Sequence, residues 1–263
     1  PDFIEALITQ DTTAIMPVHV FGTPCNVEKI QQIADRHGLK VLYDAAHAFG
    51  VEINGKPVSS FGDISMFSFH ATKIYHTIEG GALTFKDAHF KERANSLRNF
   101  GIRDLDNITE PGTNGKLNEV QAAVGILLLK LVEDEIERRK EITGLYRRLL
   151  ENTSGITTSK DIDGIKYNYP YFVIKVDKKE YGLSRDELYE ELMKYNIFAR
   201  KYFYPLCSNF QCYRDLPSAT VSRLPVANKI AEIVLALPLH GRMLNSDVEN
   251  ICSIIKNIGS SSL

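Results

Sequence analysis

The sequence predicts an α/β fold, with a mostly parallel sheet flanked by helices and a smaller α+β domain after it. Strand and helix patterns alternate along the first half of the chain, which is typical of a parallel sheet covered on both faces. The second half differs: residues 171–176 form a strand pattern, and Ser184 and Glu187 match a capping box that opens a helix. The 263 residues suffice for two cores, and we expect domains at residues 1–131 and 132–263.

The elements of the first domain follow from hydrophobic spacing and from capping residues. Residues 13–20 form a strand pattern that Pro17 should shorten or distort, and residues 26–37 form a helix between Asn26 and Gly38. Further strands are predicted at residues 39–43, 64–69 and 82–85. A long helix should start near residue 117, with an apolar face made of Leu117, Val120, Val124, Leu127, Leu128 and Leu131. The charged run at residues 133–140 has mixed signs, which favours a solvated helix face.

Composition excludes several classes of protein. There are 31 Lys and Arg against 33 Asp and Glu, a net charge of −2, which argues against a nucleic-acid partner. No apolar run is long enough to span a bilayer, so we expect no membrane association. The four cysteines include no Cys-x-x-Cys pair, which indicates buried free thiols and a cytoplasmic protein.

Two charged residues follow directly on predicted strands, at the end of a parallel sheet where ligands bind. Asp44 could pair with a cationic ring nitrogen, bind a metal ion or cap the next turn. Lys73 is either a surface residue or a desolvated amine. Burial lowers the pKa of a lysine, and an uncharged amine attacks carbonyl groups. Position alone leaves these alternatives open.

Other chemistries have weaker support. A metal site lacks a His-x-His or His-Glu-x-x-His pattern, although five residues could gather around an ion: His47, His70, His76, Asp44 and Asp63. A hydrolase built on Ser68, His47 and Asp44 lacks the Gly-x-Ser-x-Gly elbow. The glycine motifs that bind nicotinamide cofactors or ATP are missing as well.

Several ordered motifs together resemble one family. They are the runs at residues 44–50, 62–63, 67–73, 79–81, 112–123, 200–206 and 237–240. This set is similar to the DegT/DnrJ/EryC1/StrS aminotransferases, which are nucleotide-sugar aminotransferases of PLP-transferase fold type I. The resemblance covers essentially the whole chain and implies pyridoxal phosphate as cofactor.

The resemblance also implies a role for each residue of the central motifs. Lys73 would hold the cofactor as a Schiff base and move the proton between the substrate carbon and the cofactor carbon. Asp44 would keep the ring nitrogen protonated, so that the ring acts as an electron sink. Ala46 would pack against the ring, His47 would lie near the ring hydroxyl, and Ser68 would bind the phosphate.

The family further implies a homodimer with shared active sites, in which Asn114 reaches the phosphate of the neighbouring subunit's cofactor. Relatives that carry histidine in place of Lys73 run dehydrations, so this chain should transaminate. The amino donor would be an amino acid, by resemblance L-glutamate, and the acceptor a keto-deoxysugar nucleotide, most similar to the 4-keto-6-deoxy class. Four residues could contact the sugar or diphosphate, or be structural: His70, Arg200, Lys201 and Tyr204.

One departure from the family concerns the start of the chain. Family members carry a further N-terminal segment with a phosphate-binding loop and a ring that stacks on the cofactor, and neither precedes Asp44 here. We therefore expect that this chain lacks that segment. Two hypotheses follow: the chain represents a working aminotransferase, or it is a non-catalytic remnant that binds pyridoxal phosphate weakly or not at all.

Overall fold

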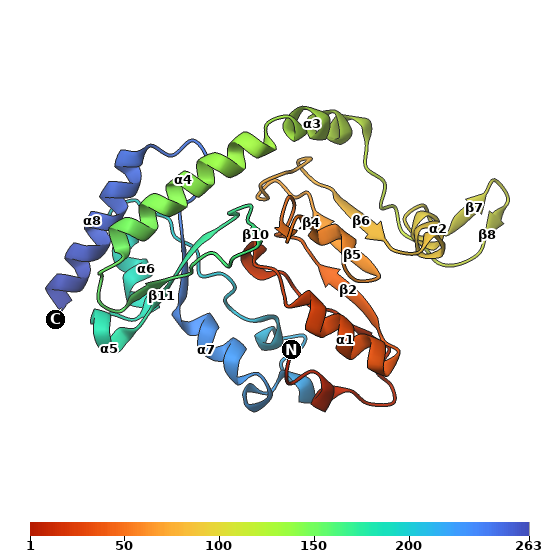
Figure 1. Cartoon of the computed structure of the whole chain (residues 1–263), viewed down its shortest axis with the longest axis horizontal. Helices are drawn as coiled ribbons and strands as arrows, with labels where there is room; N and C mark the ends of the chain where they lie inside the picture. Colours follow the sequence, from red (N-terminus) through yellow and green to blue (C-terminus); the bar gives the residue numbers. More distant parts are fainter. Residues whose placement is uncertain (263) are drawn as a thin grey trace. The chain divides into compact units, whose positions relative to one another are not determined.

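The computed structural model describes residues 1–262, which form two compact units (Figure 1). Unit 1 comprises Pro1–Ile136 and Ile162–Pro170, and unit 2 comprises Glu137–Asp161 and the chain from Tyr171 onward. The division thus follows Ile136, whereas the sequence analysis placed it at residue 131. The segment Ile162–Pro170 returns to unit 1 because a strand within it pairs there. That these units are a cofactor-binding domain and a smaller domain remains a prediction.

Unit 1 is an α/β unit with one main sheet. Its strands and helices are β1 (Ala14–Ile15), α1 (Val27–His37), β2 (Lys40–Asp44), β3 (Glu52–Ile53), β4 (Lys56–Pro57), β5 (Ile64–Ser68), β6 (Gly81–Phe85), α2 (Ala88–Leu97), β7 (Ile102–Asp104), β8 (Asn107–Ile108), α3 (Glu119–Leu129) and β10 (Ile165–Lys166). Short 3₁₀ turns lie at Glu5–Leu7, Val20–Gly22 and Val58–Ser60.

Helix α1 forms as its capping residues predict. The side chain of Asn26 accepts a hydrogen bond from the amide of Lys29 at 3.0 Å, and Gly38 ends the helix with a φ of 64°. The apolar stripe of α1 packs against β2, where Val41 and Tyr43 are buried (Figure 1). This packing holds β2 in the middle of the sheet.

The main sheet has the strand order β1-β2-β5-β6. The pairs β1-β2 and β2-β5 are parallel, as expected, but β6 runs antiparallel to β5. The connection between β5 and β6 forms turns and no helix, and without a crossover the chain returns in the opposite direction. The register aligns Asp44 with Met66, so the carboxyl ends of β2 and β5 lie at the same edge.

The predicted strand at residues 13–20 is short, as Pro17 indicated. Only Ala14–Ile15 pairs with β2, followed by one isolated bridge between Val18 and Asp44. The chain then enters the 3₁₀ turn Val20–Gly22. This turn brings the backbone of Phe21 beside the loop that follows β2.

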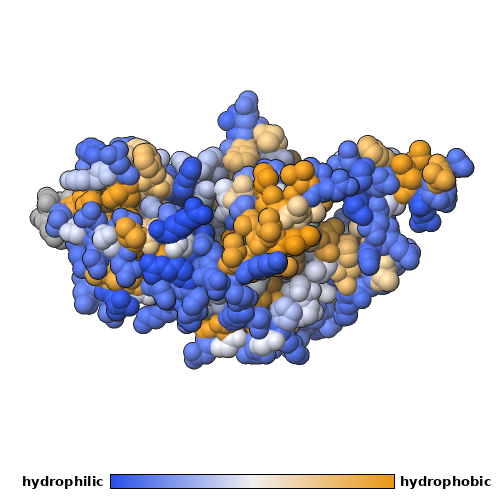
Figure 2. Space-filling view, turned by 90° about the horizontal axis from the view of Figure 1, so that it is seen from above, coloured by the Kyte–Doolittle hydropathy of each residue, from blue (hydrophilic) through white to orange (hydrophobic). Residues whose placement is uncertain are grey.

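The predicted long helix is two helices, and its apolar face is not buried. Helix α3 ends at Leu129, and α4 (Val132–Leu150) follows it. The side of α3 that packs against the rest of unit 1 is marked by Gly125, where an added Cβ would lie 2.9 Å from the hydroxyl oxygen of Tyr75. Val120 is 70% exposed and Leu127 63% exposed. Viewed from the side on which α3 lies, Figure 2 shows an apolar surface patch.

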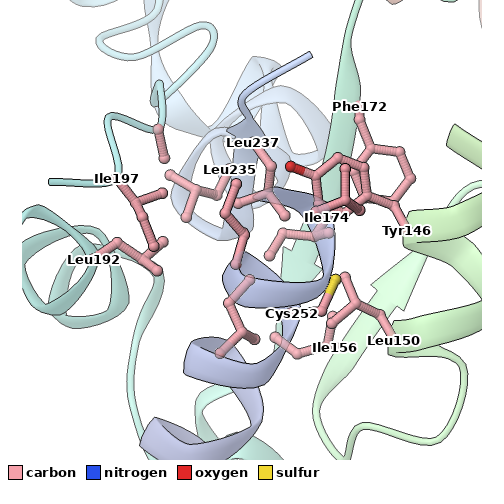
Figure 3. Close-up of a cluster of buried hydrophobic side chains, with 14 of the residues drawn as sticks. Tyr146, Leu150, Ile156, Phe172, Ile174, Leu192, Ile197, Leu235, Leu237 and Cys252 are labelled. Atoms are coloured by element: carbon pink, nitrogen blue, oxygen red, sulfur yellow. The ribbon is translucent and has the colours of Figure 1, made fainter. Parts of the chain in front are cut away.

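Unit 2 is an α+β unit around a small antiparallel sheet of order β12-β11-β9. Besides most of α4, its elements are β9 (Ile156–Thr158), β11 (Phe172–Val176), α5 (Lys178–Tyr181), α6 (Arg185–Lys194), α7 (Pro225–Ile233), β12 (Val234–Leu237) and α8 (Asn245–Ser262). Figure 3 shows its core, in which Tyr146 stacks on Phe172 at a centroid distance of 4.5 Å. The capping box of Ser184 and Glu187 opens α6, as the sequence predicted.

The cysteines differ from the expectation of buried thiols. All four are free, but only Cys252 is buried, whereas Cys207 and Cys212 are exposed and Cys25 is half-buried. Exposure of Cys207 and Cys212 follows from their position beside a short 3₁₀ turn, Cys207–Asn209, which buries no residue. Among the described helices, none combines the length and apolarity that a membrane crossing requires.

Candidate active site

Two residues of the predicted site lie at the same edge of the main sheet. Asp44 is the last residue of β2 and Ser68 is the last residue of β5, its parallel neighbour. The Oδ1 atom of Asp44 accepts a hydrogen bond from the amide of Ala46 at 3.0 Å. Asp44 therefore caps the following turn, one of the alternatives that the sequence left open, and remains half-buried. The hydroxyl oxygen of Ser68 accepts a weak bond of 3.4 Å from the amide of His70.

Lys73 lies in the turn after β5, where its amide donates to the carbonyl oxygen of His70 at 2.9 Å. Its side chain is half-buried, and this burial lowers the pKa of the ammonium group. The negative charge of Asp44 opposes that effect, so the two residues interact electrostatically. Lys73 thus matches the desolvated amine better than the surface lysine among the two sequence alternatives.

His47 joins the same cluster from the loop after β2. Burial and the positive charge of Lys73 lower the pKa of His47 to about 4, while Asp44 acts in the opposite direction. The imidazole is therefore neutral at pH 7. Its Nδ1 atom accepts a hydrogen bond from the amide of Phe21 at 3.2 Å, which places the ring proton on Nε2. His47 can thus act as a hydrogen-bond donor through Nε2.

An aromatic cluster that the sequence analysis did not identify supports these residues. Phe49 stacks on Tyr75 at 4.4 Å, and both rings meet Phe69 edge to face. Phe49 follows His47 closely in the chain, whereas Phe69 and Tyr75 flank Lys73. The sequence signal that could have revealed this cluster is the presence of aromatic residues beside both motifs. Hydrophobic periodicity does not detect it.

His19 is a second residue that the sequence analysis missed. It is fully buried, stacks on Tyr43 at 4.7 Å, and its amide donates to the carbonyl oxygen of Asp44 at 2.9 Å. The Nδ1 atom accepts from the amide of Cys25 at 3.0 Å, so the proton lies on Nε2, which has no hydrogen-bond partner among the described residues. Burial lowers the pKa of His19 to about 4, against the charge of Asp44.

The remaining candidates lie apart from this cluster or have structural partners. Asn114 is exposed in the segment after β8, where it forms a bridge with Asn99. Asp63 accepts hydrogen bonds from the amide of Val41 and the amine of Lys40, which ties the starts of two strands together. Within residues 1–262, no three His, Cys, Asp or Glu side chains cluster closely enough to hold a metal ion.

The candidate sugar-contacting residues have different surroundings. His70 is exposed and lies 3.5 Å from Glu79. In unit 2, the amine of Lys201 lies 2.7 Å from Asp186 and over the ring of Tyr189, which is a structural role. Arg200 and Tyr204 are exposed.

The side chains at the sheet edge fit pyridoxal phosphate by their chemistry. The cofactor carries a basic ring nitrogen, an aldehyde, a ring hydroxyl and a phosphate. The cluster offers an acidic group in Asp44, a partly desolvated amine in Lys73 and a neutral imidazole N–H in His47. Ser68 adds a hydroxyl group at the adjacent strand end.

Comparison with known proteins agrees with this fold. The family model described as the DegT/DnrJ/EryC1/StrS aminotransferase family matches residues 1–256. An Escherichia coli protein named dTDP-4-amino-4,6-dideoxy-D-glucose transaminase is 47% identical over 253 residues, which are 96% of this chain and 68% of that protein. This chain therefore spans about two thirds of the length of that relative.

Solved structures of similar proteins share the fold. The crystal structure of DesI in the presence of its TDP-sugar product has a TM-score of 0.92 at 33% identity, over 99% of this chain and 66% of that chain. Spr1654 from Streptococcus pneumoniae, in its PLP form, has a TM-score of 0.90 over 100% of this chain and 72% of that chain. Its identity is 24%, so this likeness shows the fold alone.

The fold is that of the type I PLP-dependent transferases, with a mixed sheet flanked by helices. The chain belongs to the DegT/DnrJ/EryC1/StrS aminotransferase family.

Proposed function

We propose that this chain carries the catalytic lysine of a pyridoxal phosphate-dependent aminotransferase that acts on a nucleotide sugar. The observation that supports the proposal most is the cluster of Lys73, Asp44 and His47. Burial lowers the pKa of the Lys73 ammonium, and the neighbouring charge of Asp44 and neutral His47 complete the groups that the cofactor requires. A lysine with a purely structural role does not require partial burial beside an acidic group and a neutral imidazole.

Each residue contributes one function to the proposed reaction. When bound, pyridoxal phosphate supplies an electron sink for the bonds of the amino carbon. Lys73 would hold the cofactor through its amine and, once the amine of the substrate has displaced it, would act as the base that carries the proton. Asp44 would keep a proton on the ring nitrogen, and His47 would offer its Nε2 proton to the ring hydroxyl. Ser68 would bind the phosphate through its hydroxyl, and Ala46 would pack against the ring.

The proposed substrates are an amino acid, L-glutamate, as donor and a keto-deoxysugar nucleotide as acceptor. The name of the Escherichia coli relative, a dTDP-4-amino-4,6-dideoxy-D-glucose transaminase, supports an acceptor with a keto group at carbon 4. Competition between dTDP-sugars that carry the keto group at carbon 3 or at carbon 4 would test this assignment. A preference for the 3-keto sugar would contradict it.

A homodimer with shared active sites is part of the same proposal. The exposed apolar side chains of α3 support it, because isolated monomers rarely expose such a patch. Asn114 lies on an exposed segment five residues before α3, where a second subunit could reach it. In this proposal Asn114 binds the phosphate of the neighbouring subunit's cofactor.

The first experiment is a titration of the purified chain with pyridoxal phosphate, followed by borohydride reduction and peptide mass mapping. We expect a visible absorbance band that L-glutamate bleaches, and a pyridoxyl adduct on Lys73. Lys73→Ala should lose the band and the adduct, whereas substitution of the exposed Lys56 by alanine should keep both.

Two other outcomes separate the alternatives. Adducts scattered over exposed lysines, with no bleaching by L-glutamate, would favour the hypothesis of a remnant that binds the cofactor weakly. A specific adduct on Lys73 without transfer to any keto sugar would support the cofactor assignment and contradict the proposed acceptor.

A further inference from the structure

Asn168 is a fully buried polar residue of unit 1 that none of the roles above uses. It lies in the segment Ile162–Pro170, which belongs to unit 1 although the chain on both sides belongs to unit 2. Strand β10 of this segment pairs with β3, and the amide of Asn54 donates to the carbonyl oxygen of Gly164 at 2.7 Å. The segment is thus attached to unit 1 just after the loop that carries His47.

The side-chain amide of Asn168 holds that loop directly. Its Nδ2 atom donates to the carbonyl oxygen of His47 at 2.8 Å and to that of Phe49 at 2.9 Å. Two acceptors require both amide hydrogens, which fixes the orientation of the amide group. The Oδ1 atom is buried and has no hydrogen-bond partner among the described residues. Both N–H groups of the Asn168 side chain therefore bind one short stretch of backbone.

The loop is held from a second direction by the turn before α1. The amide of Phe21 donates to the ring of His47, and a Cβ on the next residue, Gly22, would lie 2.5 Å from Oδ1 of Asn168. The backbone of His47 is thus fixed by Asn168 and its ring by Phe21. Phe49, the other residue that Asn168 holds, stacks on Tyr75 near Lys73.

We propose that Asn168 is a positioning residue, which fixes the loop after β2 so that the ring of His47 keeps its hydrogen bond to Phe21 and points Nε2 toward the cofactor. The last part rests on the proposed function. An apolar residue in place of Asn168 would remove the hydrogen bonds to two part-buried carbonyl oxygens, and such a loss favours any loop position in which these oxygens reach water. The loop would then leave its place while the sheet remained folded.

The test compares Asn168→Leu with Ile33→Ala in the full chain without cofactor. Leucine has the same branched arrangement of side-chain heavy atoms as asparagine and donates no hydrogen bond, whereas Ile33 is buried on α1 and serves as a control for general destabilisation. We expect Asn168→Leu to speed amide exchange at Phe21 by about tenfold beyond its effect on the core strands. The pKa of the His47 ring, followed by NMR, should rise toward its ordinary value as the ring meets water. Ile33→Ala should change exchange at all core amides alike and leave the titration of His47 as it is.

The results separate the positioning role from the proposed function. Unchanged exchange at Phe21 and unchanged titration of His47 in Asn168→Leu would overturn the proposal. If both change and the affinity for pyridoxal phosphate falls about tenfold, the whole proposal is supported. If both change but the unmodified chain binds no pyridoxal phosphate, the loop is positioned by Asn168 and the proposed function of this chain is contradicted. Should Asn168→Leu fail to fold, Asn168→Ser, which keeps one donor, must show the same two changes to a smaller extent.

Discussion

The rings of Phe49 and Tyr75 stack with their centroids 4.4 Å apart and their planes 17° apart. Phe49 belongs to the loop after β2 and Tyr75 to the turn after β5, so this contact joins the segments that carry His47 and Lys73. Two segments more than twenty residues apart in the chain are thereby fixed against each other. The groups proposed to bind the cofactor depend on that contact for their spacing.

Replacement of Phe49 or Tyr75 by leucine should therefore affect both stability and cofactor binding. We expect each variant to lower the free energy of unfolding by about 1–3 kcal/mol, and a double-mutant cycle to give a coupling of about 1 kcal/mol. Urea unfolding measures the stability, and titration with pyridoxal phosphate measures the binding. Phe172→Leu, which breaks the stack with Tyr146 in unit 2, is the matched control and should leave cofactor affinity unchanged. Equal loss of affinity in all three variants would contradict the proposed link.

The buried His19 should make stability depend on pH. Its pKa is lowered from 6.5 to about 4 in the folded chain, so the unfolded chain binds the proton more readily. The contribution of neutral His19 to the free energy of unfolding is fully present above pH 6.5. It falls by about 3 kcal/mol as the pH decreases toward 4. His19→Asn keeps an acceptor for the amide of Cys25 and removes the titration.

Urea unfolding at pH 7.5 and pH 5 would measure this effect. The difference between the two pH values should shrink in His19→Asn, whereas substitution of the exposed His89 by asparagine should leave it unchanged. An identical pH dependence in all three proteins would show that His19 does not titrate as its burial implies.

Asp63 should stabilise the folded chain through its charge. Burial opposes ionisation, but hydrogen bonds from Val41 and Lys40, with the charge of Lys40, lower its pKa below 3.8. The contribution of ionised Asp63 to the free energy of unfolding is present above pH 3.8. It is lost as the pH falls through the lowered pKa that Asp63 has in the folded chain. Asp63→Asn should cost about 1–2 kcal/mol at pH 7, and the cost should diminish near pH 3. Asp11→Asn, at an exposed position, is the control, and a cost that persists unchanged at pH 3 would point to packing as the cause.

The apolar surface of α3 should mediate association if the proposed homodimer exists. Val120→Asp and Leu127→Asp place charges on two of the exposed apolar positions of α3 and should shift the chain toward monomer in sedimentation experiments. Glu119→Gln, on the first turn of the same helix, should have little effect. If the unmodified chain is already monomeric at micromolar concentration, this chain does not dimerise by itself.

The local sequence predicted most elements of the fold and supplied the candidates for the site. Asn26 and Gly38 defined the ends of α1, and the apolar runs defined β2 and β5, because caps and strand patterns depend on near neighbours. Asp44 and Lys73 stood out by their positions after strands, whereas their proposed roles and that of Ser68 came from the family resemblance. Local patterns failed at β6, whose direction depends on the path of the chain between strands, and at α3, where apolar residues on all sides hide which side is covered.

The sequence by itself determined the family of this protein, the strands that carry its candidate site and the residues that end them. The tertiary structure alone decided the chemical state of that site. Burial makes His47 and His19 neutral and lowers the pKa of Lys73, and burial depends on residues far away in the chain. Asn168 holds the carbonyl oxygen of His47 from 121 residues away, a contact that no local pattern records. Motifs are encoded by neighbours in the chain, whereas solvation and charge depend on neighbours in space.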